Sequence, residues 1–154
     1  MPKVQGELFK GRPIIPVTVS DAAPIISDLS PQSTAPSFHV KEFRALLDTG
    51  ADITCVMPHV VSASHLVSRG VVQMTTGGGT SNHMTYQISL GILCEQLMDV
   101  DGAMEPTRTS YQLPGTYRAA EIQANSWFDL IIGMDIIENH RLILDGRSFT
   151  FELN

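Results

Sequence analysis

Within the segment 71–92, apolar and polar residues alternate with the two-residue period of a strand that buries one face. Two strand-like runs in this segment flank the stretch Gly77-Gly78-Gly79-Thr80. In the second run, polar residues alternate with Met84, Tyr86, Ile88 and Leu90. The pattern predicts a β-hairpin with a mobile tip, because adjacent glycines permit positive φ angles.

Other strands are predicted at residues 14–19, an apolar and β-branched run, and at residues 38–47, which end in the apolar run Ala45-Leu46-Leu47. Shorter strands are predicted at residues 53–57, 117–123 and 130–132. Near the end of the chain, residues 141–144 and 148–153 flank Asp145-Gly146, a pair that suits a tight hairpin turn. Residues 99–114 are weakly patterned, which predicts a loop.

Helical signals are few. Pro58 suits the first position of a short helix over 59–67 that ends at Arg69-Gly70, and Asp135 is expected to cap a brief helix that reaches Asn139. Residues 21–37 are rich in Pro, Ser and Asp, which predicts a long loop insertion. The expected fold is therefore mainly β with one or two short helices.

Length and composition narrow the function classes. With 154 residues, 43% of them hydrophobic and 17% charged, we expect one folded domain over 1–154. The formal net charge of −6 disfavours nucleic-acid partners. We find no secretory signal and no apolar run long enough to span a membrane, so we expect no membrane association and a cytoplasmic location. Cys55 and Cys94 are then expected to be reduced and buried, with a catalytic thiol as the alternative.

The most informative segment for chemistry is the run from Ala45 to Asp52. The apolar residues Ala45-Leu46-Leu47 lead directly to Asp48, and Thr49 and Gly50 follow at once. The apolar lead would bury the base of a site and orient the carboxylate, while the glycine permits a tight turn and close backbone approach. An ordinary Asx-turn is the alternative for an isolated Asp-Thr-Gly, but the flanking residues make the pattern more specific.

This segment resembles the active-site strand of the retroviral, or retropepsin-like, aspartic proteases. A second family motif is similar to residues 130–135, Leu-Ile-Ile-Gly-Met-Asp, and the glycine-rich hairpin lies between the two motifs, where the family has its flap. The resemblance extends from about Arg12 to the C-terminus and is nearest to prokaryotic members. It implies a retropepsin-like acid-protease fold, a closed β-barrel with a flap hairpin, in a homodimer. Two features depart from the viral pattern, namely Met134 in place of a basic residue and the 21–37 insertion.

The resemblance also implies roles for single residues. Asp48 corresponds to the catalytic aspartate, Thr49 to the threonine that interlocks across the dimer, and Gly50 to the glycine whose carbonyl faces the substrate. Arg12 is implied to contact the partner subunit's Asp52. One residue of the pair Ile131-Ile132 is implied to line a side-chain pocket. The implied substrate-binding residues are Ala51, Asp52, Thr76, Gly77, Gly78, Gly79, Thr80, Ile131 and Ile132.

Aspartic protease chemistry requires two carboxylates that share a proton, since like charges about 3 Å apart cannot both ionise. The chain contains one motif, because Asp101-Gly102 and Asp145-Gly146 lack the hydroxyl residue and the apolar lead. An active enzyme of this type would therefore be a homodimer that places Asp48 of both copies at the two-fold axis. Its expected substrate is a polypeptide in extended conformation, and no cofactor is required.

Other interpretations remain beside this one. A non-catalytic dimeric or peptide-binding module could retain the same fold. Asp129 is expected to be a surface residue, and Trp127 and Phe128 to belong to the core or a pocket wall. No metal site is predicted, because the spacing of metal ligands is missing among His39, His59, His65, His83 and His140.

Overall fold

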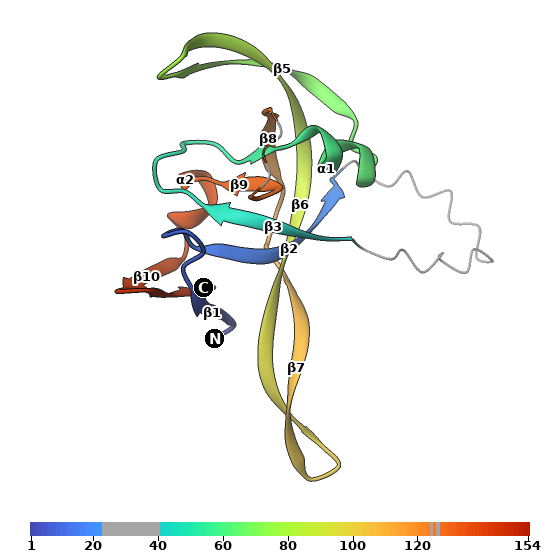
Figure 1. The fold of residues 1–154 in the computed structure, drawn as a ribbon. Coiled ribbons are helices and arrows are strands. Elements are labelled where there is room, and N and C mark those ends of the chain that lie inside the picture. The colour runs from blue at the N-terminus through green and yellow to red at the C-terminus, as the bar shows by residue number, and fades with distance from the viewer. Residues whose placement is uncertain (23–40, 124, 126) are drawn as a thin grey trace, which may run out of the picture.

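The computed structural model describes residues 1–22, 41–123, 125 and 127–154, and this part of the chain is mainly β (Figure 1). The strands are β1 (Lys3–Glu7), β2 (Ile14–Asp21), β3 (Glu42–Leu47), β4 (Cys55–Val56), β5 (Ser68–Thr76), β6 (Gly79–Val100), β7 (Ala103–Gln112), β8 (Tyr117–Glu121), β9 (Leu130–Ile132), β10 (Arg141–Asp145) and β11 (Ser148–Glu152). The helices are α1 (Pro58–Ala63) and α2 (Met134–Ile137).

The larger sheet in the described residues has eight strands and closes on itself. Its order is β2-β3-β9-β4-β8-β6-β5, β7 pairs with β6, and an additional pairing joins β2 to β6. The expected closed β-barrel thus takes the form of a ring-like sheet. Within this sheet β3 runs parallel to β9, with Ala45 beside Leu130 and Leu47 beside Ile132. The two apolar runs recognised in the sequence are therefore hydrogen-bonded neighbours.

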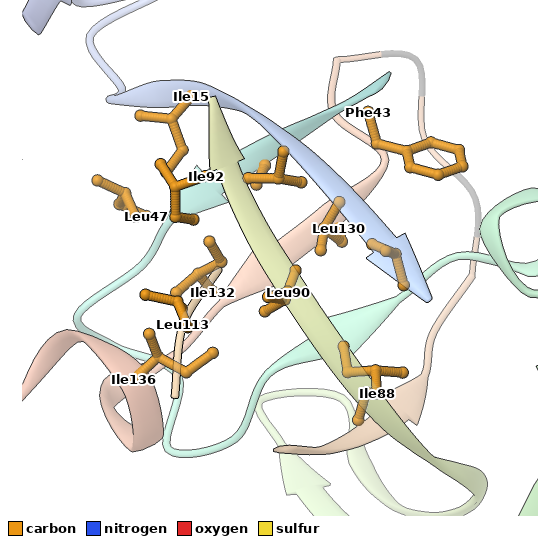
Figure 2. Packing of buried hydrophobic residues seen from close by; sticks show 14 of the residues in the cluster. Ile15, Phe43, Leu47, Ile88, Leu90, Ile92, Leu113, Leu130, Ile132 and Ile136 are labelled. Atoms are coloured by element: carbon orange, nitrogen blue, oxygen red, sulfur yellow. The ribbon is translucent and has the colours of Figure 1, made fainter. Parts of the chain in front are cut away.

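The core lies inside this ring. The predicted alternation along β6 is confirmed for Ile88 and Leu90, which are fully buried, whereas Met84 lies beyond the core and is 51% exposed. Figure 2 shows side chains from β3, β6 and β9 gathered in the same interior, including Leu47, Leu90 and Ile132. Burying each such side chain stabilises the fold by about 1.5–3 kcal/mol. The core thus fixes the base of the 45–52 segment.

A second sheet is made from the two ends of the chain, in the order β1-β11-β10. The predicted hairpin at Asp145-Gly146 is confirmed, with Gly146 at a φ of 60°. The strand β1 was not predicted, because its residues alternate between exposed and half-buried positions and only one of them, Val4, is large and apolar. It pairs with β11 from Lys3 opposite Glu152 to Glu7 opposite Ser148.

The prediction of a loop over 99–114 is wrong. Residues of β6 up to Val100 pair with β7, and the two strands form a long hairpin that projects away from the core at the end opposite the β5–β6 tip (Figure 1). Both faces of the hairpin's outer half are exposed, so no buried face imposes a two-residue period. The turn residues Asp101 and Gly102 have φ angles of 53° and 85°, as expected for a tight hairpin turn.

Both helices are shorter than predicted. α1 begins at Pro58 as expected but ends at Ala63, and Arg69-Gly70 lies inside β5 at an irregularity of register. α2 ends at Ile137 rather than Asn139. Of the expected 21–37 insertion, Asp21 ends β2 and residue 22 follows it, while 23–37 lie outside the described residues, as do residues 38–40 of the predicted 38–47 strand.

Candidate active site

Asp48 stands at the end of β3, where the parallel neighbour β9 also ends. Its backbone N–H donates to the carbonyl of Ile132 at 3.0 Å, and the N–H of Leu47 donates to the carbonyl of Pro13 at 3.0 Å. Strands on both sides therefore fix the backbone just before the loop that joins β3 to β4. The apolar lead noted in the sequence supplies this anchorage, since Leu46 and Leu47 are buried.

The carboxylate of Asp48 is oriented by its own loop. The N–H of Gly50 donates to Asp48 Oδ1 at 2.9 Å, and the N–H of Ala51 donates to the Asp48 carbonyl at 3.2 Å. Asp48 is half-buried, while Thr49, Gly50 and Asp52 are exposed. The loop therefore holds one carboxylate in a defined orientation at the surface of the chain.

Residues 133–135, in the second family motif, support the loop that carries Asp48. At the start of α2, the N–H of Met134 donates to the Ala51 carbonyl at 2.7 Å, and that of Asp135 donates to the Asp52 carbonyl at 3.3 Å. A Cβ at Gly133 would lie 2.8 Å from both the Ala51 carbonyl oxygen and the Ile53 carbonyl carbon. Glycine is required here because two backbones meet without room for a side chain.

Asp135 and Thr54 form a hydrogen-bonded link beneath the loop. Asp135 Oδ2 accepts from the N–H of Thr54 at 3.0 Å, and Asp135 Oδ1 accepts from its hydroxyl at 2.9 Å. The Thr54 hydroxyl oxygen in turn accepts from the N–H of Gly133 at 3.2 Å. The prediction that Asp135 caps α2 is therefore wrong, since the N-cap is Gly133 and the carboxylate holds Thr54 instead. No local signal in the sequence reveals this contact across 81 positions.

Cys55 follows Thr54 and is free and buried, as predicted, and so is Cys94. Burial raises the pKa of the Cys55 thiol to about 11, and the negative charges of Asp135 and Asp48 add to the effect. A thiol with this pKa remains protonated near neutral pH. The alternative of a thiolate nucleophile at Cys55 is therefore disfavoured.

We expect Cys55 to resist iodoacetamide in the native protein at pH about 8 and to react after unfolding in urea. With a pKa of about 11, roughly one Cys55 thiol in a thousand is ionised at that pH, and the side chain is also inaccessible. Mass spectrometry of peptides after timed alkylation measures the labelling, with Cys94 as an internal comparison. Fast native labelling of Cys55 would contradict the described burial.

The glycine-rich hairpin is confirmed as the β5–β6 hairpin. Thr76 pairs with Gly79 across the tip, the hydroxyls of Thr75 and Thr80 lie 3.1 Å apart, and Gly79 has a φ of 115°. All of these residues are exposed. In Figure 1 the tip bends toward the side on which the loop between β3 and β4 lies. This is the arrangement expected of a flap.

The remaining predicted site residues take different places. Ile131 is half-buried and Ile132 is fully buried in the core, so Ile131 is the one available to line a pocket.

Arg12 is exposed, and its guanidinium lies 5.2 Å from the centre of the Trp127 ring. The Lys10 ammonium lies 4.1 Å from the centre of the same ring. Trp127 is thus half-buried beneath two cations rather than part of the core. The contact between Arg12 and the partner subunit's Asp52 stays a prediction.

Asp129 has structural partners that were not anticipated. Its carboxylate accepts from the N–H of Arg44 and lies beside His59 Nε2, each at 2.7 Å. This half-buried side chain ties β3 to α1. Phe128 is half-buried next to it.

Two further features of the described residues concern cofactors and membranes. Their His, Cys, Asp and Glu side chains include no group of three placed to hold a metal ion. None of the helices in this part of the chain is both long and apolar enough to cross a bilayer.

Comparison with known proteins identifies the family. The family model for the retroviral aspartyl protease matches residues 10–145, and the chain therefore belongs to this family. Its fold is retropepsin-like: a solved retropepsin-like aspartic protease from Rickettsia conorii has 11% identity and a TM-score of 0.50, over 98% of this chain and 89% of that one.

A second similar structure is the retroviral protease-like domain of Ddi1 from Leishmania major, with 13% identity and a TM-score of 0.40, over 88% of this chain and 82% of that one. No curated protein matches the sequence.

Proposed function

We propose that this chain, as a single domain over 1–154, is an aspartic endopeptidase that acts as a homodimer. The observation that carries the proposal is the Asp48 carboxylate, which the Gly50 N–H orients at 2.9 Å in the segment that resembles the family's active-site strand. Membership of the retroviral aspartyl protease family supports a peptidase. One chain supplies one such carboxylate, so the site is completed by Asp48 of the partner subunit.

In the proposed reaction the two Asp48 carboxyl groups share one proton. The ionised carboxylate removes a proton from a bound water, whose oxygen attacks the carbonyl carbon of the substrate, while the protonated partner donates its proton to the carbonyl oxygen. The resulting diol collapses as the C–N bond breaks. One carboxyl group protonates the leaving amine and the other accepts a proton from a diol hydroxyl, so no cofactor is consumed.

The proposed substrate is a polypeptide in extended conformation, held between the Asp48 loops and the flaps. Residues 76–80 would pair with the substrate backbone as an added strand, which gives affinity with little sequence preference. Gly50, Ala51 and Asp52 would border the substrate from the other side, and the half-buried Ile131 would line a side-chain pocket. Thr49 would contact its mate across the dimer axis.

A mixed peptide library tests this proposal. We expect the purified protein to cut internal peptide bonds somewhere between acidic and neutral pH, without loss of rate in a metal chelator, and with inhibition by hydroxyl-bearing transition-state mimics. Mass spectrometry gives the cleavage positions and the specificity together. Analytical ultracentrifugation of the same protein, under the conditions in which cleavage occurs, should give the mass of a dimer.

Two outcomes would contradict the proposal. A dimer that binds peptides but leaves them intact at every pH would favour the non-catalytic peptide-binding module. Cleavage that stops in the chelator would indicate a metal-dependent activity unrelated to Asp48.

A further inference from the structure

Basic side chains gather on two aromatic rings at the turn between β1 and β2. The Phe9 ring lies 5.8 Å from the Lys10 ammonium and 4.9 Å from the Arg44 guanidinium. The Trp127 ring lies beneath Lys10 as well, with Arg12 at its side. Lys10 and Arg44 are exposed, and Phe9 is 44% exposed. These four residues, Phe9, Lys10, Arg44 and Trp127, form a surface that we call the basic patch.

The cations of the basic patch have no acidic partner within the described ranges of the chain. The ion pairs found there involve His59, Arg69, Arg108 and Arg141 instead. Asp129 accepts the backbone N–H of Arg44, but its carboxylate makes its ion pair with His59. Like charges that lie together repel each other, and a bound anion would relieve this repulsion.

The turn that carries Lys10 is tightly built. Phe9 and Arg12 exchange two backbone hydrogen bonds, of 2.9 and 3.0 Å, around the central residues Lys10 and Gly11. Both central residues have positive φ, 50° for the lysine and 75° for the glycine. Glycine, asparagine and aspartate are favoured at such positions, so a lysine there costs conformational energy. A cation kept at this cost favours a function for its charge.

The basic patch lies near the proposed catalytic loop. The Pro13 carbonyl, one residue beyond the turn, accepts the N–H of Leu47, which directly precedes Asp48. In Figure 1 the connection between β1 and β2 lies next to the end of β3. Arg44 precedes Asp48 by four residues of the chain. At a rise of about 3.3 Å per strand residue, an extended polypeptide covers the corresponding distance, about 13 Å, with about four residues.

We infer that the basic patch binds acidic side chains of the polypeptide substrate, at about four to six residues from the bond that is cut. The inference rests on the proposed function and adds the class of substrate, a polypeptide with an acidic segment beside the cleavage position. The Arg44 guanidinium can hold a carboxylate through two parallel N–H donors, and the Lys10 ammonium supplies further donors. Arg12 is not counted as a ligand, because the family resemblance implies that it contacts the partner subunit's Asp52.

Nucleic acid is the other anionic polymer that basic and aromatic side chains can bind, through phosphate contacts and base stacking. The net charge of −6 repels a long phosphate backbone, whereas a short acidic segment meets the basic patch alone. An acidic polypeptide is therefore the favoured ligand, and an oligonucleotide serves as a competitor in the experiment.

Peptide kinetics test the inference. The peptide that the wild-type protein cuts fastest is extended with Glu-Glu, Gln-Gln or Lys-Lys, placed about four to six residues from the cleaved bond. We expect the KM of the Glu-Glu peptide to be about tenfold below that of the Gln-Gln peptide. The two kcat values should be nearly equal, because the basic patch does not touch the reacting atoms. The difference in KM should shrink at high salt, since exposed charges are screened.

Charge reversal tests the residues themselves. Lys10→Glu combined with Arg44→Glu should transfer the preference to the Lys-Lys peptide. Lys41→Glu combined with Arg118→Glu is the matched control, because both residues are exposed and the change in net charge is the same. Lys41 also lies over an aromatic ring, that of Phe43, at 5.6 Å. This control should keep the preference for the Glu-Glu peptide. Lys10→Asn combined with Arg44→Gln removes both charges, keeps a residue suited to the turn, and should abolish the preference.

Trp127 reports binding without any need for cleavage. It is the single tryptophan of the chain, and Lys10 and Arg12 lie against its ring. In the Asp48→Asn variant, which should leave peptides uncut, we expect a saturable change in Trp127 emission with the Glu-Glu peptide and little change with the Gln-Gln peptide. A short oligothymidylate should not displace the Glu-Glu peptide at equal concentration.

The outcomes separate this inference from the proposed function. Equal KM values and equal fluorescence responses for the Glu-Glu and Gln-Gln peptides, in a protein that cuts both, overturn the inference and leave the proposed function intact. Tighter binding of the oligonucleotide than of the Glu-Glu peptide overturns the acidic polypeptide as the ligand. A saturable response to the Glu-Glu peptide, when the wild-type protein cuts no peptide, overturns the proposed function and supports the basic patch as a binding site for acidic polypeptides.

Discussion

Asp48→Asn is expected to abolish peptide cleavage while the fold and the dimer remain intact. Asparagine has the same shape, and its carboxamide oxygen can still accept the Gly50 N–H that now bonds Asp48 Oδ1 at 2.9 Å. The substituted pair, however, has no ionised carboxylate to remove a proton from water. Since one substitution changes both halves of a homodimeric site, we expect kcat/KM to fall by about 10⁴, the upper end of what general acid–base catalysis contributes. The measurement uses the peptides that the wild-type protein cuts fastest.

Asp129→Asn is the matched control for this loss. Asp129 also accepts a backbone N–H, from Arg44 at 2.7 Å, but it lies in the contact between β3 and α1 rather than in the Asp48 loop. We expect this variant to retain the wild-type cleavage pattern, which shows that loss of a carboxylate elsewhere is tolerated. Persistent, chelator-insensitive cleavage by the purified Asp48→Asn protein would exclude Asp48 from the chemistry.

Several of the strands that the sequence predicts correctly have a buried face. In β6 the residues Ile88 and Leu90 alternate with polar positions because the strand has a core side and an exposed side. The run Leu130–Ile132 was predicted because it is short, apolar and followed by a glycine. In both cases burial imposes a pattern on neighbouring residues, and a pattern can be read without knowledge of the partner strand.

The features that were missed have no buried face or depend on distant partners. The outer half of β6 and β7 is exposed on both sides, so backbone pairing and the Asp101-Gly102 turn define it without an apolar period. The link between Asp135 and Thr54 joins residues 81 positions apart. Asp135 stands two residues after Gly133, where capping is the natural local interpretation, and only the folded chain brings Thr54 within reach. The motif residues were recognisable in the sequence, whereas their supporting contacts were not.

Asp135→Ala is expected to lower both the stability of the protein and its catalytic rate. The carboxylate accepts the N–H and the hydroxyl of Thr54, a fully buried residue, at 3.0 and 2.9 Å. Leaving two buried donors without an acceptor costs about 1–3 kcal/mol each, so we expect the free energy of unfolding to fall by about 2–6 kcal/mol. Urea denaturation measures the loss. The Asp48 loop also loses its support, because Thr54 closes that loop.

To show that Asp135 positions Asp48, a variant must lose catalytic rate as well as stability. At a temperature where Asp135→Ala is still folded, we expect kcat to fall by about tenfold or more, while KM changes little, because the substrate still meets the flap and the pocket. Asp129→Ala removes a carboxylate with two partners of its own and should lower stability without this loss of kcat. Thr54→Val, which keeps the shape but removes the hydroxyl from the link to Gly133, should lower kcat in the same direction as Asp135→Ala. If both variants retain the wild-type kcat when folded, the link stabilises the chain without positioning Asp48.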